Sequence, residues 1–409
     1  MGIGTPTVKG KQHISGRVMA LARIWLRFEA MSEIRPFRLQ VSQSALDDLH
    51  ACIDATRWPE RETVDDWSQG VPLGRLRDLT HYWRHHYDWR RCETRLGAWD
   101  QCVTGIDGLD IHFIHARSPH PEAVPLILTH GWPGSVIEYL DCIGPLVDPP
   151  AHGGSARDAF HVVVPSLPGY GFSGKPQARG WGVERIGRAW VELMRRLGYD
   201  RWFAHGGDWG AIVTATMGGQ APAGLAGIHL NMPLARPTRA DHADPDPDVQ
   251  RALQAGAAYK ARESGYSTQQ STRPQTIGYA LVDSPVALAA WIYEKMMTWT
   301  DNRGHPEDAI SRDAILDNIM LYWLPASGAS AARLYWESFG QVGTMDEVHL
   351  PTAISTFPCE ITKAPRKWVE RRLRNIVYWN DCDRGGHFAA WEQPDIFVAE
   401  LRKAFAAMR

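Results

Sequence analysis

The sequence predicts an α/β protein with a mostly parallel, doubly wound sheet, and two observations indicate this class. The first is a series of short, almost purely apolar runs, such as PLILT and HVVVP, that alternate with stretches of helical periodicity. Strands buried on both faces of a parallel sheet have this composition, because helices cover both faces. The second is the length of 409 residues, enough for one large domain or two to three small ones.

The composition is that of a globular chain whose partner is a small molecule. The formal net charge is −2, which gives no electrostatic reason to expect nucleic acid or an anionic membrane surface as a partner. The six cysteines are scattered without a C-x-x-C pair, as is typical of free thiols in a reducing cytoplasm. We therefore expect a cytoplasmic protein without disulfides, metal or cofactor, and the sequence leaves its oligomeric state open, a homodimer included.

Residues 1–33 are expected to form a disordered extension. Their apolar run, VMALARIWL, is interrupted by Arg23 and is well short of the roughly 20 residues that a membrane span needs. Arg27 and Glu29 also argue against a secretory signal peptide. Met31 is an alternative start, and we expect no membrane span.

Residues 34–103 are expected to form an N-terminal, mainly helical attachment. A short strand, PFRLQV, leads into SQSALDDLHACIDATRW, whose apolar residues recur at helical spacing behind Ser42 or Ser44 as the cap. The following DLTHYWRHHYDWRRCETRL is predicted to be another helical segment rich in aromatic residues.

Residues 104–233 and 348–409 are expected to form the α/β core. VTGIDGLDIHFIHARS alternates apolar and polar positions around Asp107 and Gly108, which predicts a β-hairpin. The apolar strand runs that follow are VPLILTHGWPGS, FHVVVPSLPGYG, WFAHGGDWG, LAGIHLNMP, TAISTFPCE, with its strand over 353–358, and IVYWNDC.

Residues 234–347 are expected to form a helical lid, because the strand pattern disappears there and helices replace it. One of these helices is predicted to begin with Ser284 as its cap and Pro285 in its first turn, and to run through VALAAWIYEKMMTW. A helical insertion between two core strands covers the end of the sheet.

The stretch AHGGDWGA, residues 204–211, predicts a nucleophile elbow with Asp208 at its tip. In such an elbow the attacking residue sits on a strained turn between a strand and a helix, and the residues two before and two after it are small. Gly206 and Gly210 occupy those places, and the positive end of the following helix favours an ionised Asp208. The alternative is an ordinary glycine turn in which Asp208 caps the helix.

Two further motifs favour the elbow. HGWPGS directly follows an apolar strand, where the backbone N–H of Trp132 supplies half of an oxyanion hole and that of Trp209, the residue after the nucleophile, supplies the other half. In RGGHFAAWEQPD, His387 lies between a glycine pair and a helix start. Asp208 precedes His387 in the chain, which is the order of nucleophile and histidine expected with such an elbow.

Five motifs together resemble the epoxide hydrolases of the microsomal type, which have the α/β-hydrolase fold. They are HGWPGS, SLPGYGFSGKP, GGDWG, DSPVALAAWI and RGGHFAAWEQPD, and the resemblance covers nearly everything from Ile34 onward. It implies an epoxide hydrolase whose partners are a small apolar epoxide and water and whose product is a vicinal diol.

The resemblance also assigns roles. The third member of the catalytic triad corresponds to Glu360, with Asp381 and Asp383 as rivals that are less suited because they lie too near His387 in the sequence to turn back on it. Tyr335 and Tyr266, the latter expected in a loop, correspond to two lid tyrosines that act as acids. A phenol with a pKa of about 10 can donate a proton to the opening epoxide oxygen where a carboxylate cannot.

The implied mechanism has two steps. Asp208 attacks an epoxide carbon to form an alkyl ester, and His387 then activates water to hydrolyse that ester. A haloalkane dehalogenase shares the aspartate and the ester and is the nearest alternative; it needs halide-binding donors such as tryptophan. A non-catalytic receptor with this fold is the other alternative, favoured only by loss of the catalytic residues.

Overall fold

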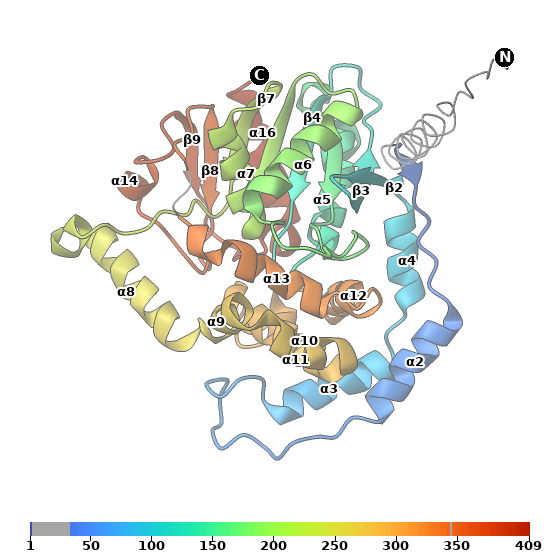
Figure 1. Ribbon diagram of the computed structural model, residues 1–409. Coiled ribbons are helices and arrows are strands. Elements are labelled where there is room, and N and C mark those ends of the chain that lie inside the picture. The colour runs from blue at the N-terminus through green and yellow to red at the C-terminus, as the bar shows by residue number, and fades with distance from the viewer. Residues whose placement is uncertain (2–32, 344–345) are drawn as a thin grey trace.

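The structure, a computed structural model, describes Met1, residues 33–343 and residues 346–409. The disordered extension and the alternative start at Met31 that the sequence suggests therefore lie almost entirely outside the described residues. Figure 1 shows a central sheet with helices on both faces and a layer of helices below it. The predicted doubly wound α/β architecture is confirmed.

The sheet follows the predicted apolar runs. Within the described residues its order is β1-β2-β3-β5-β4-β6-β7-β8-β9, antiparallel from β1 to β5 and parallel from β5 to β9. The strands are β1 (Arg35–Pro36), β2 (Gln101–Ile106), β3 (Leu109–Ala116), β4 (Val124–Thr129), β5 (Phe160–Pro165), β6 (Trp202–Gly206), β7 (Leu225–Leu230), β8 (Thr352–Thr356) and β9 (Ile376–Asp381).

The predicted hairpin is confirmed, and two strand lengths differ from expectation. Asp107 and Gly108 both have positive φ, 50° and 80°, as the two-residue turn between β2 and β3 requires. Of the strand expected over PFRLQV, residues 36–41, only Pro36 lies in a strand, the two-residue β1 at the sheet edge. The strand expected over 353–358 ends at Thr356, two residues before Pro358, which has no N–H to donate to a neighbouring strand.

Helices cover both faces of the parallel sheet. The helices α6 (Val183–Arg196) and α7 (Trp209–Gln220) pack together on one face, and α5 (Leu140–Val147) and α16 (Pro394–Ala406) pack together on the other. In α6 the buried residues Ile186, Trp190 and Leu193 recur at helical spacing, so one face of this helix faces the core. Two short helices, α14 (Arg366–Val369) and α15 (Ala389–Glu392), follow β8 and precede α16.

The N-terminal attachment contains three helices rather than two. Ser42 caps α2 (Gln43–Asp54), which confirms the first of the two expected caps. The predicted second segment is divided into α3 (Leu73–His85) and α4 (Trp89–Gly97), because Asp88 adopts an extended conformation and accepts a hydrogen bond from the Arg90 N–H as the cap of a new helix. These helices pack on the lid: α2 and α3 on α11, and α4 on α12.

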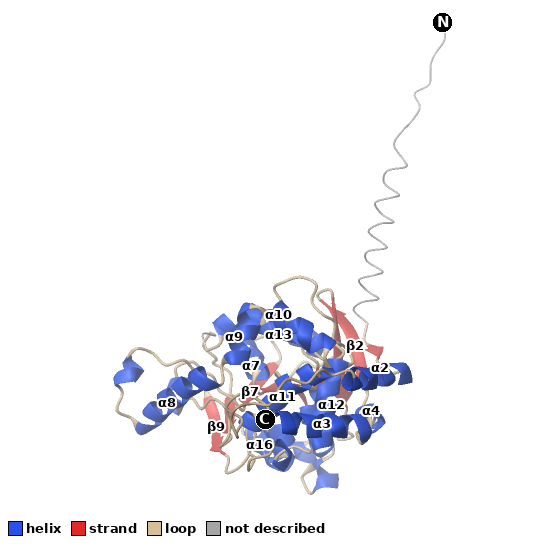
Figure 2. Ribbon diagram, turned by 90° about the horizontal axis from the view of Figure 1, so that it is seen from below, coloured by secondary structure: helices blue, strands red, loops and turns tan. Residues whose placement is uncertain are grey.

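The helical lid between β7 and β8 is confirmed. Its helices are α8 (Pro247–Arg262), α9 (Gly265–Thr272), α10 (Pro274–Asp283), α11 (Pro285–Trp299), α12 (Arg312–Trp323) and α13 (Gly328–Ser338). As predicted, α11 begins at Pro285 with Ser284 as its cap. Seen from below in Figure 2, the lid helices and α3 spread across the sheet while α8 projects to one side.

No single helix in the described ranges is long and apolar enough to cross a membrane. The pair α10 and α11 reaches the required length and composition only together, and the two helices are bent by 115° at their junction.

Candidate active site

Asp208 stands at a strained turn between β6 and α7. Its φ of 49° and ψ of −127° are unusual for a residue with a side chain, and such strain is concentrated at functional sites. A Cβ atom at Gly206 would overlap the Gly210 carbonyl, and one at Gly210 would overlap the carbonyl oxygen of Thr129 in β4. The glycines therefore allow the strand and the helix to approach closely, and this fixes the position of Asp208.

The Asp208 carboxylate is hydrogen-bonded to one of the two predicted oxyanion amides. The Trp132 backbone N–H donates to Asp208 Oδ1 at 2.8 Å. Trp209 is the first residue of α7, so its N–H belongs to the free amides at the positive end of that helix. At Gly131 a Cβ atom would overlap the carboxylate, so the HGWPGS loop needs a glycine there.

Helix α12 of the lid holds the HGWPGS loop in place. Asn318 Nδ2 donates to the Pro133 carbonyl at 2.8 Å, and the Tyr322 hydroxyl donates to the Gly134 carbonyl at 2.7 Å. His130 is a structural residue of the same loop: burial lowers its pKa to about 4, and its ring is bonded to the backbone of Gly131 and Leu167. The loop is thus fixed from the lid and from the core.

His387 connects the Asp208 and Glu360 carboxylates. Its Nδ1 lies 2.7 Å from Glu360 Oε1, and its Nε2 lies 3.3 Å from Asp208 Oδ2. All three side chains are largely buried, with exposed fractions of 1% for His387, 2% for Glu360 and 13% for Asp208. The rival Asp381 is engaged elsewhere, since its Oδ1 accepts from Thr356 Oγ1 and Trp379 Nε1.

The charge state of His387 depends on its two carboxylate neighbours. Burial by itself lowers the pKa of His387, but the charge of Glu360 and the hydrogen bonds to Asp208 and Glu360 outweigh burial and raise the pKa well above its usual value. The imidazole is therefore protonated at neutral pH. Loss of either negative charge lowers this pKa.

The two lid tyrosines meet above Asp208. Tyr266 stacks on the Trp132 ring with centroids 4.9 Å apart, and Tyr335 meets the Trp209 ring edge-on at 4.8 Å. The two phenol rings are 5.7 Å apart. Burial raises the pKa of both phenols well above the usual value, so both keep their protons at neutral pH.

The expectation that Tyr266 lies in a loop is wrong: it is the second residue of α9. The sequence GYSTQQST lacks a long apolar stripe, so its helical periodicity is weak. Packing of Tyr266 against Trp132 and Trp299 stabilises this short helix where intrinsic propensity does not.

Three polar residues near the site were not predicted from the sequence. The Tyr259 hydroxyl lies 2.8 Å from the Tyr266 hydroxyl, and Glu138 and Asn231 line a small cavity together with Asp208 and His387. Glu138 lies four residues after Gly134, and Asn231 directly follows β7. Asn231 follows the carboxyl end of a parallel strand, which is a position where sites gather, so the sequence held a signal for it.

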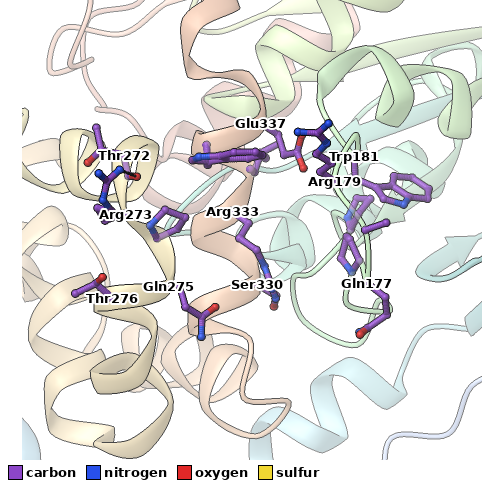
Figure 3. A pocket seen from close by; sticks show the side chains of 16 residues that line it. Gln177, Arg179, Trp181, Thr272, Arg273, Gln275, Thr276, Ser330, Arg333 and Glu337 are labelled. Carbon is purple, nitrogen blue, oxygen red and sulfur yellow. Dashed lines mark hydrogen bonds between the residues drawn. The ribbon is translucent and has the colours of Figure 1, made fainter.

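A larger pocket, of about 400 Å³, lies beside α13 but does not contain the triad. Figure 3 shows Thr272, Arg273 and Gln275 on one side of it and Gln177 and Arg179 on the other. Neither Asp208 nor His387 lines this pocket, whereas both line the small cavity at the elbow.

Comparison with known proteins agrees with this arrangement. Residues 34–139 match the family model of the epoxide hydrolase N terminus, and residues 124–277 match that of the alpha/beta hydrolase fold. The chain is 56% identical over 376 residues to a provisionally assigned epoxide hydrolase of Stigmatella aurantiaca, covering 92% of this chain and 86% of that protein. It is 36% identical over 401 residues to epoxide hydrolase 1 of Oryctolagus cuniculus, covering 90% of this chain and 88% of that protein.

A solved structure extends the comparison to three dimensions. The juvenile hormone epoxide hydrolase of the silkworm Bombyx mori superposes with a TM-score of 0.84 at 30% sequence identity, covering 92% of this chain and 95% of that chain. The similarity therefore includes the N-terminal attachment and the lid as well as the core.

Proposed function

The chain belongs to the epoxide hydrolase family, and from this premise we propose that it converts a small apolar epoxide to a vicinal diol through an ester on Asp208. One observation carries the proposal. The Asp208 carboxylate has an amide donor on one oxygen and His387 beside the other, while two protonated phenols pack on Trp132 and Trp209, the residues that flank it.

In the first step an Asp208 oxygen forms a bond to an epoxide carbon, and the carbon–oxygen bond of the ring breaks. The electron pair of that bond goes to the ring oxygen, which takes a proton from Tyr266 or Tyr335. Aspartate suits this chemistry because its product is an ester, which water can hydrolyse. Attack by a serine leaves an ether, which water does not cleave.

Ester formation also prepares His387 for the second step. The ester carries no charge, so one of the two carboxylates that raise the pKa of His387 disappears and this pKa falls. His387 then gives up its proton, which replaces the proton that the phenol lost in the first step. The neutral imidazole then accepts a proton from water at Nε2, while Glu360 keeps the ring oriented through Nδ1. His387 is thus protonated before ester formation and neutral when it activates water.

The water oxygen adds to the ester carbon, and the amides of Trp132 and Trp209 stabilise the resulting oxyanion. Collapse of this intermediate breaks the bond between the Asp208 carboxyl carbon and the alkoxy oxygen, which takes the proton of the added hydroxyl and leaves as the diol, while His387 keeps the proton that it took from water. The carboxylate of Asp208 is restored.

The aromatic surroundings of the carboxylate support an apolar substrate. The rings of Trp132, Trp299, Tyr266 and Tyr335 pack on one another around it, and the phenol oxygens add hydrogen-bond donors to a mainly apolar wall. These lid phenols also favour an epoxide over a haloalkane, because a leaving halide needs no proton.

Oxygen labelling in a single turnover tests the ester. Enzyme in excess of styrene oxide is mixed in H₂¹⁸O, and the diol and the peptide carrying Asp208 are weighed. We expect unlabelled diol and ¹⁸O in Asp208, because the diol oxygen comes from the carboxylate and water repairs the carboxylate. Direct attack of water on the epoxide predicts the reverse, with ¹⁸O in the diol and an unlabelled Asp208.

A further inference from the structure

A small cavity lies beside the Asp208 carboxylate. Its volume of about 10 Å³ is roughly the room that one water molecule needs. The groups around it include Glu138, Asn231, Asp208 and His387. It therefore adjoins both the carbon that water must attack and the nitrogen that must take the proton.

Two buried polar atoms at this cavity lack a good hydrogen-bond partner when water must attack the ester. Oδ1 of Asn231 has no partner, and Nε2 of His387 has only Asp208 Oδ2 at 3.3 Å, a contact that weakens when this carboxylate becomes an uncharged ester. Buried polar atoms are nearly always paired with protein or with an ordered water, so two such atoms at one cavity indicate a water site. Both act as acceptors when His387 is neutral, and a water molecule has two protons to give.

The third polar group is the Glu138 carboxyl, on the short 3₁₀ helix η1 (Val136–Tyr139) that follows the HGWPGS loop. A Cβ atom at Gly134 would overlap Glu138 Oε1, so the missing side chain at Gly134 makes the space for this carboxyl. Burial raises the pKa of Glu138 to about 8, against an opposing effect of the His387 charge. At neutral pH the carboxyl is protonated and can donate a hydrogen bond.

We propose that Glu138 and Asn231 hold the hydrolytic water against His387, and that Glu138 is a further catalytic residue of the second step. The water gives one proton to His387 Nε2 and directs the other to Asn231 Oδ1, while Glu138 donates to the water oxygen. This leaves one lone pair of that oxygen for the ester carbon. The inference rests on the ester mechanism proposed above.

The proposed step is balanced without any other reactant. The water oxygen forms a bond to the Asp208 carboxyl carbon, and its proton passes to His387. The second proton stays on the oxygen until the intermediate collapses. Glu138 keeps its own proton throughout, so it orients the water and does not act as the base.

The test separates the two steps. Ester formation and ester decay are followed by rapid quench and intact-protein mass, with styrene oxide as the probe, in wild type, Glu138→Ala, Glu138→Gln and Asn231→Ala. We expect Glu138→Ala and Asn231→Ala to slow ester decay by roughly 10- to 100-fold, the loss of one oriented hydrogen bond, and to leave ester formation within about threefold. Glu138→Gln retains an N–H donor and should lie between Glu138→Ala and wild type.

Glu400→Gln is the matched control. Glu400 is also a buried carboxyl, but it bonds Ser355 and Tyr378 away from the cavity, so its replacement should leave the ratio of the two rates unchanged. Equal slowing of both steps in the Glu138 and Asn231 variants would overturn the proposal, and so would an unchanged decay rate. If Glu138→Ala does not fold, the ratio of the ester decay rate to the ester formation rate in Glu138→Gln and Asn231→Ala tests the proposal.

The failure of this inference is distinguishable from failure of the ester mechanism. If no ester forms in any variant, wild type and His387→Gln included, the mechanism itself is wrong. If the ester forms and decays at the wild-type rate without Glu138, only the water site is wrong.

Discussion

The core side and the lid side of the active site are built in different ways. On the core side, the position of Asp208 is fixed by backbone contacts, since Gly206 and Gly210 leave no space between β6, α7 and β4. On the lid side, Tyr266 and Tyr335 are held by ring packing on Trp132, Trp209 and each other.

This difference indicates that the two sides need different degrees of rigidity. A nucleophile needs a fixed distance to its base and its amides, and a backbone provides that more rigidly than packed side chains do. In the proposed mechanism the acid that meets the epoxide oxygen tolerates more freedom, because either of the two phenols can donate. Substitutions on the core side should therefore lower activity and stability more than substitutions of similar size on the lid side.

The largest effect is expected from Asp208→Asn. The amide keeps the shape of the side chain but removes the attacking charge, so diol formation should fall by roughly four orders of magnitude or more while the fold is retained. Steady-state activity and circular dichroism check both statements. Because asparagine can deamidate to aspartate, the variant must be weighed before and after the assay; full activity with asparagine intact contradicts the assignment.

On the lid side, the double variant Tyr266→Phe/Tyr335→Phe should slow ester formation by roughly 10² to 10⁴. Each single variant should be affected much less, because the remaining phenol still donates to the epoxide oxygen. The measurement is the single-turnover rate of ester formation on styrene oxide. Two single effects that multiply to give the double effect would show that the phenols do not substitute for each other.

The contrast also concerns stability. Gly210→Ala should lower the free energy of unfolding by about 3 kcal/mol or more, because its Cβ would overlap the Thr129 carbonyl. Gly256→Ala in lid helix α8 is the matched control: it has open space around it and should raise stability by about 0.5 to 1 kcal/mol. Thermal unfolding of both variants tests this, and equal melting temperatures would refute the close approach at the elbow.

A pH dependence of stability is expected from Glu138. Its folded pKa of about 8 lies above the ordinary 4.5, so folding disfavours the ionised form. The free-energy cost of burying the ionised Glu138 carboxyl is absent below pH 4.5 and grows as the pH rises towards 8. Wild type should therefore lose stability relative to Glu138→Gln across this window, by at most about 1.4 kcal/mol per pH unit. A difference in free energy of unfolding that does not vary with pH would contradict the buried carboxyl.

The sequence predicted the core better than the lid for a physical reason. Strands buried on both faces must be apolar, and an elbow must have glycines two residues to either side of its tip, so β4 to β8 and Asp208 could be located from local patterns. The hairpin at Asp107 and Gly108 was equally local, because its turn needs positive φ at both residues.

What the sequence could not show depends on tertiary contacts. Helix α9 is stabilised by Tyr266 packing on Trp132, more than a hundred residues away in the chain, so local periodicity misassigned it to a loop. Glu138 looks like an ordinary polar residue of a helix. Its proximity to Asn231 and His387 becomes visible only when three separate segments of the chain meet in the folded structure.

The measurement that tests the central claim most directly is the intact mass of His387→Gln after addition of an epoxide. If Asp208 attacks first and His387 serves only to activate water, the variant should accumulate an adduct of the substrate mass on the peptide that contains Asp208. In Glu360→Gln the same adduct should decay more slowly than in wild type, whereas Asp381→Asn and Asp383→Asn should decay normally. Absence of any adduct in His387→Gln, together with continued diol formation, would contradict the ester mechanism.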